Sequence, residues 1–129
     1  MRTARELWES VYTEIDADNA PALFELCAAD VEIRTASQHT KGANRLGEMF
    51  AQQRGLYDEL EHKVDGIIES ADGSALSVEL SLSGVPKGTD RRLAWNVVET
   101  IRADAGHIVS WHAMLDRTGL IQQIRALHG

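Results

Sequence analysis

The stretch that decides the fold is ALSVELSLSGVPKGTDRRLAWNVVETIRADAGHIVSWHAML, residues 75–115. Every second residue from Leu76 to Leu82 is apolar, and serine or glutamate separates them, which is the period of a strand with one buried face. Turn-forming residues and further segments rich in β-branched and aromatic residues follow. The turns fall at 84–90 and 104–107, and the later strands at 92–103 and 107–115. The stretch therefore predicts three consecutive antiparallel strands.

Upstream of this stretch the chain switches between the helical period and the strand period. The predicted elements are helices over 7–15, 23–26 and about 43–54, strands over 30–36 and 60–65, and a polar loop over 37–42. Asp72–Gly73 is typical of a hairpin turn between the last of these strands and the next. Downstream, Thr118 is a candidate cap for a short final helix.

Helices followed by a run of strands are typical of an α+β protein with an antiparallel sheet. We therefore predict one domain over residues 1–129, in which a curved, mostly antiparallel sheet wraps around three N-terminal helices. A sheet curled in this way leaves a pocket at its open end, where a ligand can bind.

Composition narrows the class of partner. The formal net charge of −7 argues against nucleic acid and anionic membranes, because both need a basic surface. The first twenty residues lack an apolar signal segment, and no apolar run approaches the roughly 20 residues of a membrane helix, so we expect a cytoplasmic protein. The five histidines and the single Cys27 show no metal-ligand spacing, and no glycine-rich phosphate loop occurs, so we expect neither metal nor cofactor.

Three segments resemble a known family. They are LWESVYTEIDADNAPALFELCAADVEI (7–33), HTKGANRLGEMF (39–50) and AGHIVSWHAMLDRTGLIQQI (105–124). Together they are similar to the NTF2-like superfamily, in particular its SnoaL-like branch of polyketide cyclases, ketosteroid isomerases and limonene-type epoxide hydrolases. The resemblance implies a cone-shaped α+β fold with a central pocket, a small hydrophobic ligand, and a homodimer formed through the convex face of the sheet.

The same resemblance implies that the family's best-known catalytic groups are missing. The carboxylate base of the isomerases falls on Thr35, and the acid of the cyclases and hydrolases falls on Ala113. The oxyanion tyrosine falls on Val11, and the second oxyanion residue falls on Asn96. Neither threonine nor valine can take a proton from a carbon acid near neutral pH, so isomerisation by that mechanism is disfavoured.

Strand parity, taken from the resemblance, then predicts the pocket. The predicted ligand-binding residues are Trp8, Val11, Met49, Phe50, Val98, Trp111, Ala113 and Leu115. Asn96 is the predicted polar group that would polarise a carbonyl or stabilise an oxyanion. Thr35 on the first strand is a second predicted polar group of the site, and His39 is the candidate base at the cone mouth. A bulge that shifted the register of its strand would instead bring Glu79 into the cavity as the missing carboxylate.

Three functions remain open at this point. The chain is either a cofactor-free enzyme that cyclises, isomerises, dehydrates or hydrolyses a polyketide-like or terpenoid-like molecule, or a non-catalytic small-molecule-binding protein on the same scaffold. The third is a dimer-only interaction module whose cone is filled by its own side chains. The size of the cavity separates the third from the other two.

Overall fold

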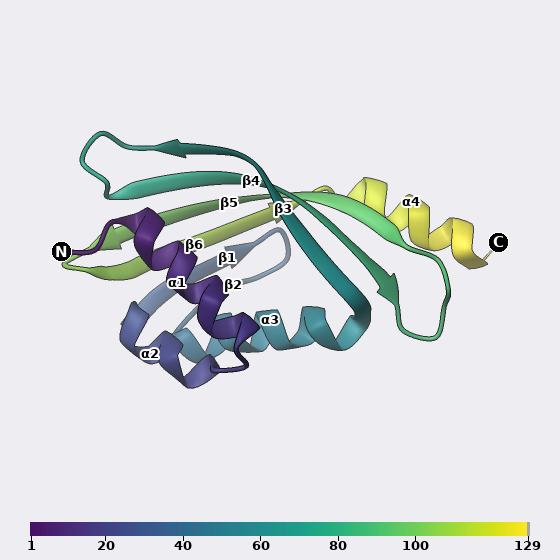
Figure 1. Cartoon of the computed structure of the whole chain (residues 1–129), viewed down its shortest axis with the longest axis horizontal. Helices are drawn as coiled ribbons and strands as arrows, with labels where there is room; N and C mark the ends of the chain where they lie inside the picture. The colour runs from purple at the N-terminus through teal and green to yellow at the C-terminus, as the bar shows by residue number, and fades with distance from the viewer. Residues whose placement is uncertain (129) are drawn as a thin grey trace.

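The computed structural model describes residues 1–128, apart from the side chains of Arg117, Thr118 and His128 (Figure 1). The elements are α1 (Ala4–Asp16), the 3-10 turn η1 (Ala20–Ala22), α2 (Leu23–Leu26), β1 (Cys27–Thr35), β2 (His39–Lys41), α3 (Ala43–Leu56), β3 (Tyr57–Glu69), β4 (Ala75–Pro86), β5 (Leu93–Asp104), β6 (His107–Leu115) and α4 (Arg117–His128). The predicted capping by the Thr118 side chain lies outside the described side chains.

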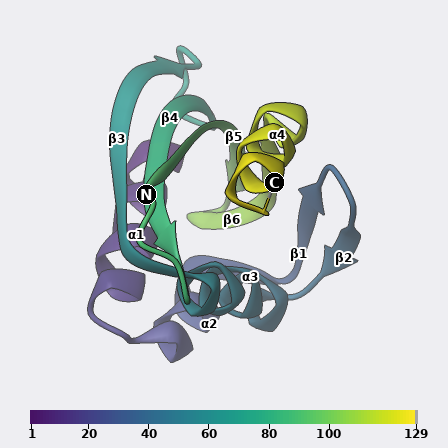
Figure 2. The same cartoon turned by 90° about the vertical axis from the view of Figure 1, so that its right-hand side faces the viewer.

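The six strands form one curved, open sheet in the order β2-β1-β6-β5-β4-β3. Neighbouring strands are antiparallel except β1 and β6, which are parallel. Helices α1, α2 and α3 lie on one side of the sheet, and the sheet bends around them (Figures 1 and 2). The predicted α+β fold with a curved, mostly antiparallel sheet is confirmed.

Helix α1 forms where the sequence predicts it and shows why that prediction works. Thr3 and Glu6 make a capping box, in which each side chain accepts a hydrogen bond from the other's backbone N–H. The apolar stripe of this helix, which includes Leu7 and Val11, is buried against the concave face of the sheet. The helix therefore places its aromatic residues over the middle of the sheet.

Helix α4 covers an edge that β6 leaves open. Strand β5 pairs with β6 only from Val97 onward, so its first residues have no strand partner on that side. The side-chain amide of Gln123 takes the place of a strand there, because it accepts from the backbone N–H of Ala94 at 3.0 Å and donates to its carbonyl at 2.7 Å. This docking holds α4 beside the start of β5 (Figure 2).

Two predictions about the strands are wrong. The segment predicted as a polar loop contains β2, which pairs antiparallel with β1, because backbone pairing overrides the polar character of three exposed residues. The inward parity predicted for Asn96 and Val98 in β5 is also wrong. Asn96 lies opposite Ser81 on the outward side of β4, and residues that face each other across a sheet share a face.

Candidate functional site

A cavity of about 460 Å³ opens at the wide end of the cone. Apolar side chains from the sheet and from α3 form most of its wall, among them Phe50, Leu80, Trp95 and Val97. Polar side chains gather at α3 and at the turn after β1, namely Thr35, Ser37, Gln38, Gln52 and Gln53. A mostly apolar cavity of this size with a few polar groups suits a small organic molecule. It argues against the hypothesis that the protein's own side chains fill the cone.

The wall of this cavity contains one carboxyl group, that of Glu99 on β5. Only 3% of this residue is exposed. The indole N–H of Trp8 donates to Glu99 Oε1 at 3.0 Å, and the hydroxyl of Tyr12 donates to the same oxygen at 2.8 Å. Glu99 Oε2 accepts from none of the described residues, so it is the oxygen left for the cavity.

Burial raises the pKa of Glu99 above its ordinary value, because the charged form loses its hydration. The hydrogen bonds from Trp8 and Tyr12 act in the opposite direction, and so does the nearby indole N–H of Trp111, since each favours the charged form. Burial and the neighbouring carboxylate also raise the pKa of Tyr12 well above its ordinary value, so its hydroxyl stays protonated. A carboxyl of this kind can hold a proton at a pH where ordinary glutamates have lost it.

Four aromatic rings pack around the carboxyl and fix its partners. The Tyr12 ring lies 5.0 Å from that of Trp8, centroid to centroid, and meets Phe50 edge-on at 5.4 Å. Phe50 also meets Trp111 edge-on at 5.9 Å. The two donors to the carboxyl both lie on α1, and side chains from α3 and β6 pack against the Tyr12 ring, so these donors are held by the fold rather than by a flexible loop.

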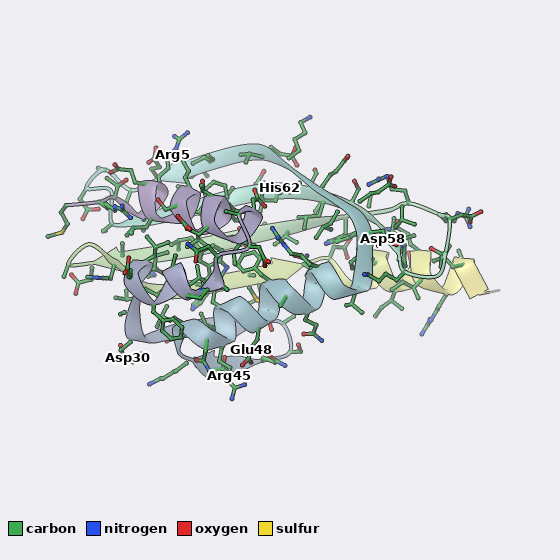
Figure 3. All side chains as sticks on the ribbon, turned by 60° about the horizontal axis from the view of Figure 1, so that its bottom comes forward. Arg5, Asp30, Arg45, Glu48, Asp58 and His62 are labelled. Carbon is green, nitrogen blue, oxygen red and sulfur yellow. The ribbon has the colours of Figure 1, made fainter. Side chains whose placement is uncertain are left out.

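A second hollow of about 330 Å³ adjoins the first, and the two share Tyr12, Phe50, Gln53 and Leu82. His62 on β3, which is labelled in Figure 3, is one of the residues that line it. The His62 ring lies 5.0 Å from that of Tyr12, centroid to centroid. An ion pair between Arg54 and Asp16, at 2.8 Å, lies at its edge. This hollow is smaller and more polar than the first, and among the described residues Asp16 supplies the one carboxyl that lines it.

A SnoaL-like domain model matches residues 8–111 of the chain. The chain belongs to the SnoaL-like family. Its fold is similar to that of an NTF2-like protein from Burkholderia thailandensis, with a TM-score of 0.79, 21% identity, and coverage of 96% of this chain and 98% of the other. No curated protein sequence matches it.

Two further solved structures share this fold. A SnoaL-like polyketide cyclase from Agrobacterium tumefaciens has a TM-score of 0.78 at 14% identity, over 96% of this chain and 99% of the other. An LEH-like epoxide hydrolase from M. tuberculosis has a TM-score of 0.71 at 16% identity, over 92% of this chain and 82% of the other. At these identities the similarity establishes the fold of this SnoaL-like chain. Its chemistry has to be inferred from its own residues.

The residue predicted to be the main polar group of the SnoaL-like pocket is on the wrong side of the sheet. Asn96 is exposed on the outer face, where its side-chain oxygen accepts from Ser81 at 3.3 Å. Val98, 41% exposed, lies on the same outer face. His39 is exposed on β2 and lies 3.3 Å from Glu32, away from the cavity lining. Glu79 is exposed as well, because the register irregularity falls in β3 and leaves the alternation of β4 intact.

The other predicted residues lie in or just behind the wall. Thr35, Met49, Phe50, Ala113 and Leu115 line the cavity. Trp8, Val11 and Trp111 are buried in the layer behind it. Trp8 and Trp111 nevertheless bear on the site, since both act on the Glu99 carboxyl. Which of these residues touch a ligand stays a prediction.

Sequence reasoning missed Glu99 and Tyr12, although a signal for Glu99 was present. Leu93, Trp95, Val97 and Ile101 occupy alternate positions of β5, and Glu99 interrupts this apolar series. A single carboxylate in an otherwise apolar face of a central strand indicates a buried acid, which makes it a candidate for the site. The prediction failed because parity was taken from the family resemblance rather than from the strand's own apolar alternation.

None of the described helices is long and apolar enough to span a bilayer. Within residues 1–128, no three histidine, cysteine or acidic side chains are placed to hold a metal ion together. The predicted homodimer remains a prediction.

Proposed function

We propose that this chain is a cofactor-free enzyme in which Glu99 acts as general acid on a small, largely apolar organic molecule. The substrate would carry a carbonyl, hydroxyl or epoxide oxygen, as polyketide-like and terpenoid-like molecules do. The observation that carries the proposal is a buried carboxyl with one oxygen held by two donors and the other left for a cavity of about 460 Å³.

The proposed step follows from this asymmetry. Oε1 accepts from Trp8 and Tyr12, so in the neutral acid the proton belongs on Oε2. Oε2 transfers its proton to the substrate oxygen while a C–O bond breaks or a C–C bond forms at the neighbouring carbon. The resulting carboxylate remains hydrogen-bonded through Oε1, and it recovers a proton from the product or from water. A single acid of this kind suits opening of an epoxide by water, which gives up the proton that restores the acid. It also suits loss of water, in which the neighbouring carbon gives up that proton after the C–O bond breaks. Ring closure is possible for a dicarbonyl that reaches the site as its enol, whose O–H proton is the one returned.

Isomerisation through an enolate is the reaction that the site supports least. Thr35 lines the cavity at the position that the family resemblance gives to the base, and a threonine hydroxyl does not remove a proton from carbon near neutral pH. Ala113 likewise lines the cavity where the resemblance places an acid. Glu99 lies directly opposite Ala113 in the β5–β6 pair, so the carboxyl of this site sits on the neighbouring strand.

The second candidate is a binding protein that does not turn its ligand over. The observation in its favour is the same pair of uncharged residues, Thr35 and Ala113, in the cavity wall. In this case Glu99 would serve as a hydrogen-bond donor that orients a ligand oxygen. The two candidates differ in one respect, namely whether removing the acid abolishes turnover or only weakens binding.

The test uses Glu99→Gln, which keeps the shape and the acceptor oxygen but cannot give up a proton. Binding of 2-naphthol, an aromatic alcohol with fluorescence sensitive to protonation, is measured beside turnover of styrene oxide and of 2,6-heptanedione. We expect the variant to bind 2-naphthol within about threefold of the parent and to lose 10²- to 10⁴-fold in turnover of either substrate, roughly the contribution of a general acid. Glu79→Gln, which changes an exposed carboxyl on the outer face, is the matched control.

Turnover that survives Glu99→Gln would remove this carboxyl from the reaction. Binding of 2-naphthol by the parent with no turnover of either substrate would favour the binding protein. Failure to bind 2-naphthol at all would argue against both candidates.

A further inference from the structure

One buried polar side-chain atom among the described residues has no hydrogen-bond partner. Trp111 is fully buried, at 0% exposure, and its indole N–H is the one buried side-chain polar atom in the described part of the chain that makes no hydrogen bond. A buried N–H without an acceptor is unfavourable, and such groups in native proteins call for an explanation. The surroundings of Trp111 offer one.

Trp111 is a diagonal neighbour of Glu99 on the inner face of the sheet. It pairs with Ile101 across β5 and β6, while Glu99 pairs with Ala113, two residues further along β6. Diagonal neighbours on one face are within reach of long and aromatic side chains. The indole N–H of Trp111 also lowers the pKa of Glu99, although its geometry falls short of a hydrogen bond to the carboxyl.

The protonation state of Glu99 explains why the Trp111 N–H has no acceptor. Because Oε1 accepts from Trp8 and Tyr12, the proton of the neutral acid lies on Oε2. A protonated carboxyl oxygen is a weak acceptor, so it gains little from another donor. When that proton leaves, Oε2 becomes a charged acceptor in a nearly dry environment. Trp111 is the neighbouring N–H that is free to bind it.

We infer that Trp111 is a positioning residue whose indole N–H pairs with Glu99 Oε2 only when Glu99 is ionised. This inference rests on the proposed function for its catalytic meaning, because an interaction made only as the acid gives up its proton favours the transition state over the ground state. It stands on its own as a statement about the carboxyl.

The other groups that face the carboxyl are few. Tyr12 from α1 is titratable, and its hydroxyl already binds Oε1. Two further groups act on Tyr12 rather than on the carboxyl. The ring of His62 from β3 contacts the Tyr12 ring, and the charge of Asp16 from α1 raises the pKa of Tyr12. Strand β4 contributes the apolar Val78 opposite Glu99, and α3 contributes Phe50.

The test is an NMR titration of the whole protein from pH 4 to 10, without any ligand. Chain labelled with ¹³C in the glutamate carboxyl groups and ¹⁵N in the indoles reports both partners at once. Trp8→Phe, Trp95→Phe and Trp111→Phe assign the three indole signals, and Glu99→Gln assigns the carboxyl signal. We expect the Trp111 N–H proton signal to move downfield with the same midpoint as the Glu99 carboxyl carbon.

In Trp111→Phe the midpoint of Glu99 should rise by about one pH unit, because one donor to the charged form is lost. Trp95→Phe is the matched control, since Trp95 lies on the same face of β5 but makes no hydrogen bond to the carboxyl, and it should leave the midpoint unchanged. If Trp111→Phe does not fold, 3-benzothienylalanine at position 111 keeps the bicyclic shape without the N–H.

A Trp111 N–H signal that does not shift as Glu99 ionises would overturn the inference. An unchanged Glu99 midpoint in Trp111→Phe would do the same. A Glu99 carboxyl that stays neutral up to pH 10 would overturn it too, since no charge would form for the N–H to bind. A Glu99 midpoint at or below the ordinary glutamate range would count against the proposed general acid, whereas a raised midpoint that Trp111 does not affect would count against this inference alone.

Discussion

Replacing Glu99 by glutamine should change how the stability of the protein depends on pH. Burial raises the pKa of Glu99 above its ordinary value of 4.5, so the folded chain keeps a proton that the unfolded chain has released. Where the unfolded state binds fewer protons than the folded state, stability falls as pH rises. The contribution of Glu99 is therefore fully present below about pH 4.5 and is lost as pH rises through the folded pKa.

The size of the effect follows from the contacts. Glutamine keeps an oxygen that can accept from Trp8 at 3.0 Å and from Tyr12 at 2.8 Å, so near pH 4 the variant and the parent should differ by less than about 1 kcal/mol. Above that pH the variant should gain about 1.4 kcal/mol over the parent for each pH unit that separates the folded pKa from the unfolded one. The difference then levels off.

Urea unfolding at each half unit from pH 4 to 9, followed by tryptophan fluorescence and circular dichroism, measures this difference directly. Glu79→Gln on the outer face of β4 is the matched control, and its pH dependence should follow that of the parent. A difference between Glu99→Gln and the parent that stays constant across the whole range would refute the reasoning, because it would mean that Glu99 titrates alike in the folded and unfolded chains.

Three further outcomes test the geometry. Asn96→Ala should change the free energy of unfolding by less than about 0.5 kcal/mol and leave 2-naphthol binding intact, because the side chain is exposed on the outer face. Loss of 2-naphthol binding in this variant would instead show that Asn96 faces the cavity. Ala113→Phe should fill part of the cavity and weaken 2-naphthol binding at least tenfold while the protein stays folded, as fluorescence titration and circular dichroism would reveal; unchanged affinity would place the ligand elsewhere. Asp72 has a pKa lowered to about 2 by hydrogen bonds from Ser74 and Ser70, so the parent should keep this turn's contribution above the ordinary pKa of 3.8 and lose it as pH falls through about 2. Asp72→Asn should then lower the melting temperature at pH 7 but make less difference at pH 2, and equal effects at both would contradict this account.

Local patterns in the sequence were enough to predict most of the elements. The apolar stripe from Leu7 to Ile15 predicts α1, and the alternation from Leu76 to Leu82 predicts both β4 and its buried face. These signals work because burial on one side imposes a period on the chain that the residues alone reveal. Strand β2 was missed, since it is three residues long and none of them is buried.

The candidate site was predicted only in part, because it depends on which side of a central strand faces inward. Residues such as Thr35, Phe50 and Ala113 were correctly expected near the cavity. For β5, however, the pairing with β4 sets Ser81 opposite Asn96 and so fixes which residues face outward. Ser81 and Asn96 are fifteen positions apart in the sequence and lie on different strands. An error of one residue in parity exchanged an exposed amide for a buried acid.

The sequence by itself determined that this chain is an acidic α+β protein of the SnoaL-like family with helices packed inside a curved sheet, since those features follow from composition, local period and family motifs. Only the tertiary structure decided which groups surround the acid. Trp8 and Tyr12 on α1 are 91 and 87 positions from Glu99 in the chain, and no local pattern links them to it. The chemistry of the carboxyl comes from desolvation and from these distant donors, and both exist only once the helix has packed on the sheet.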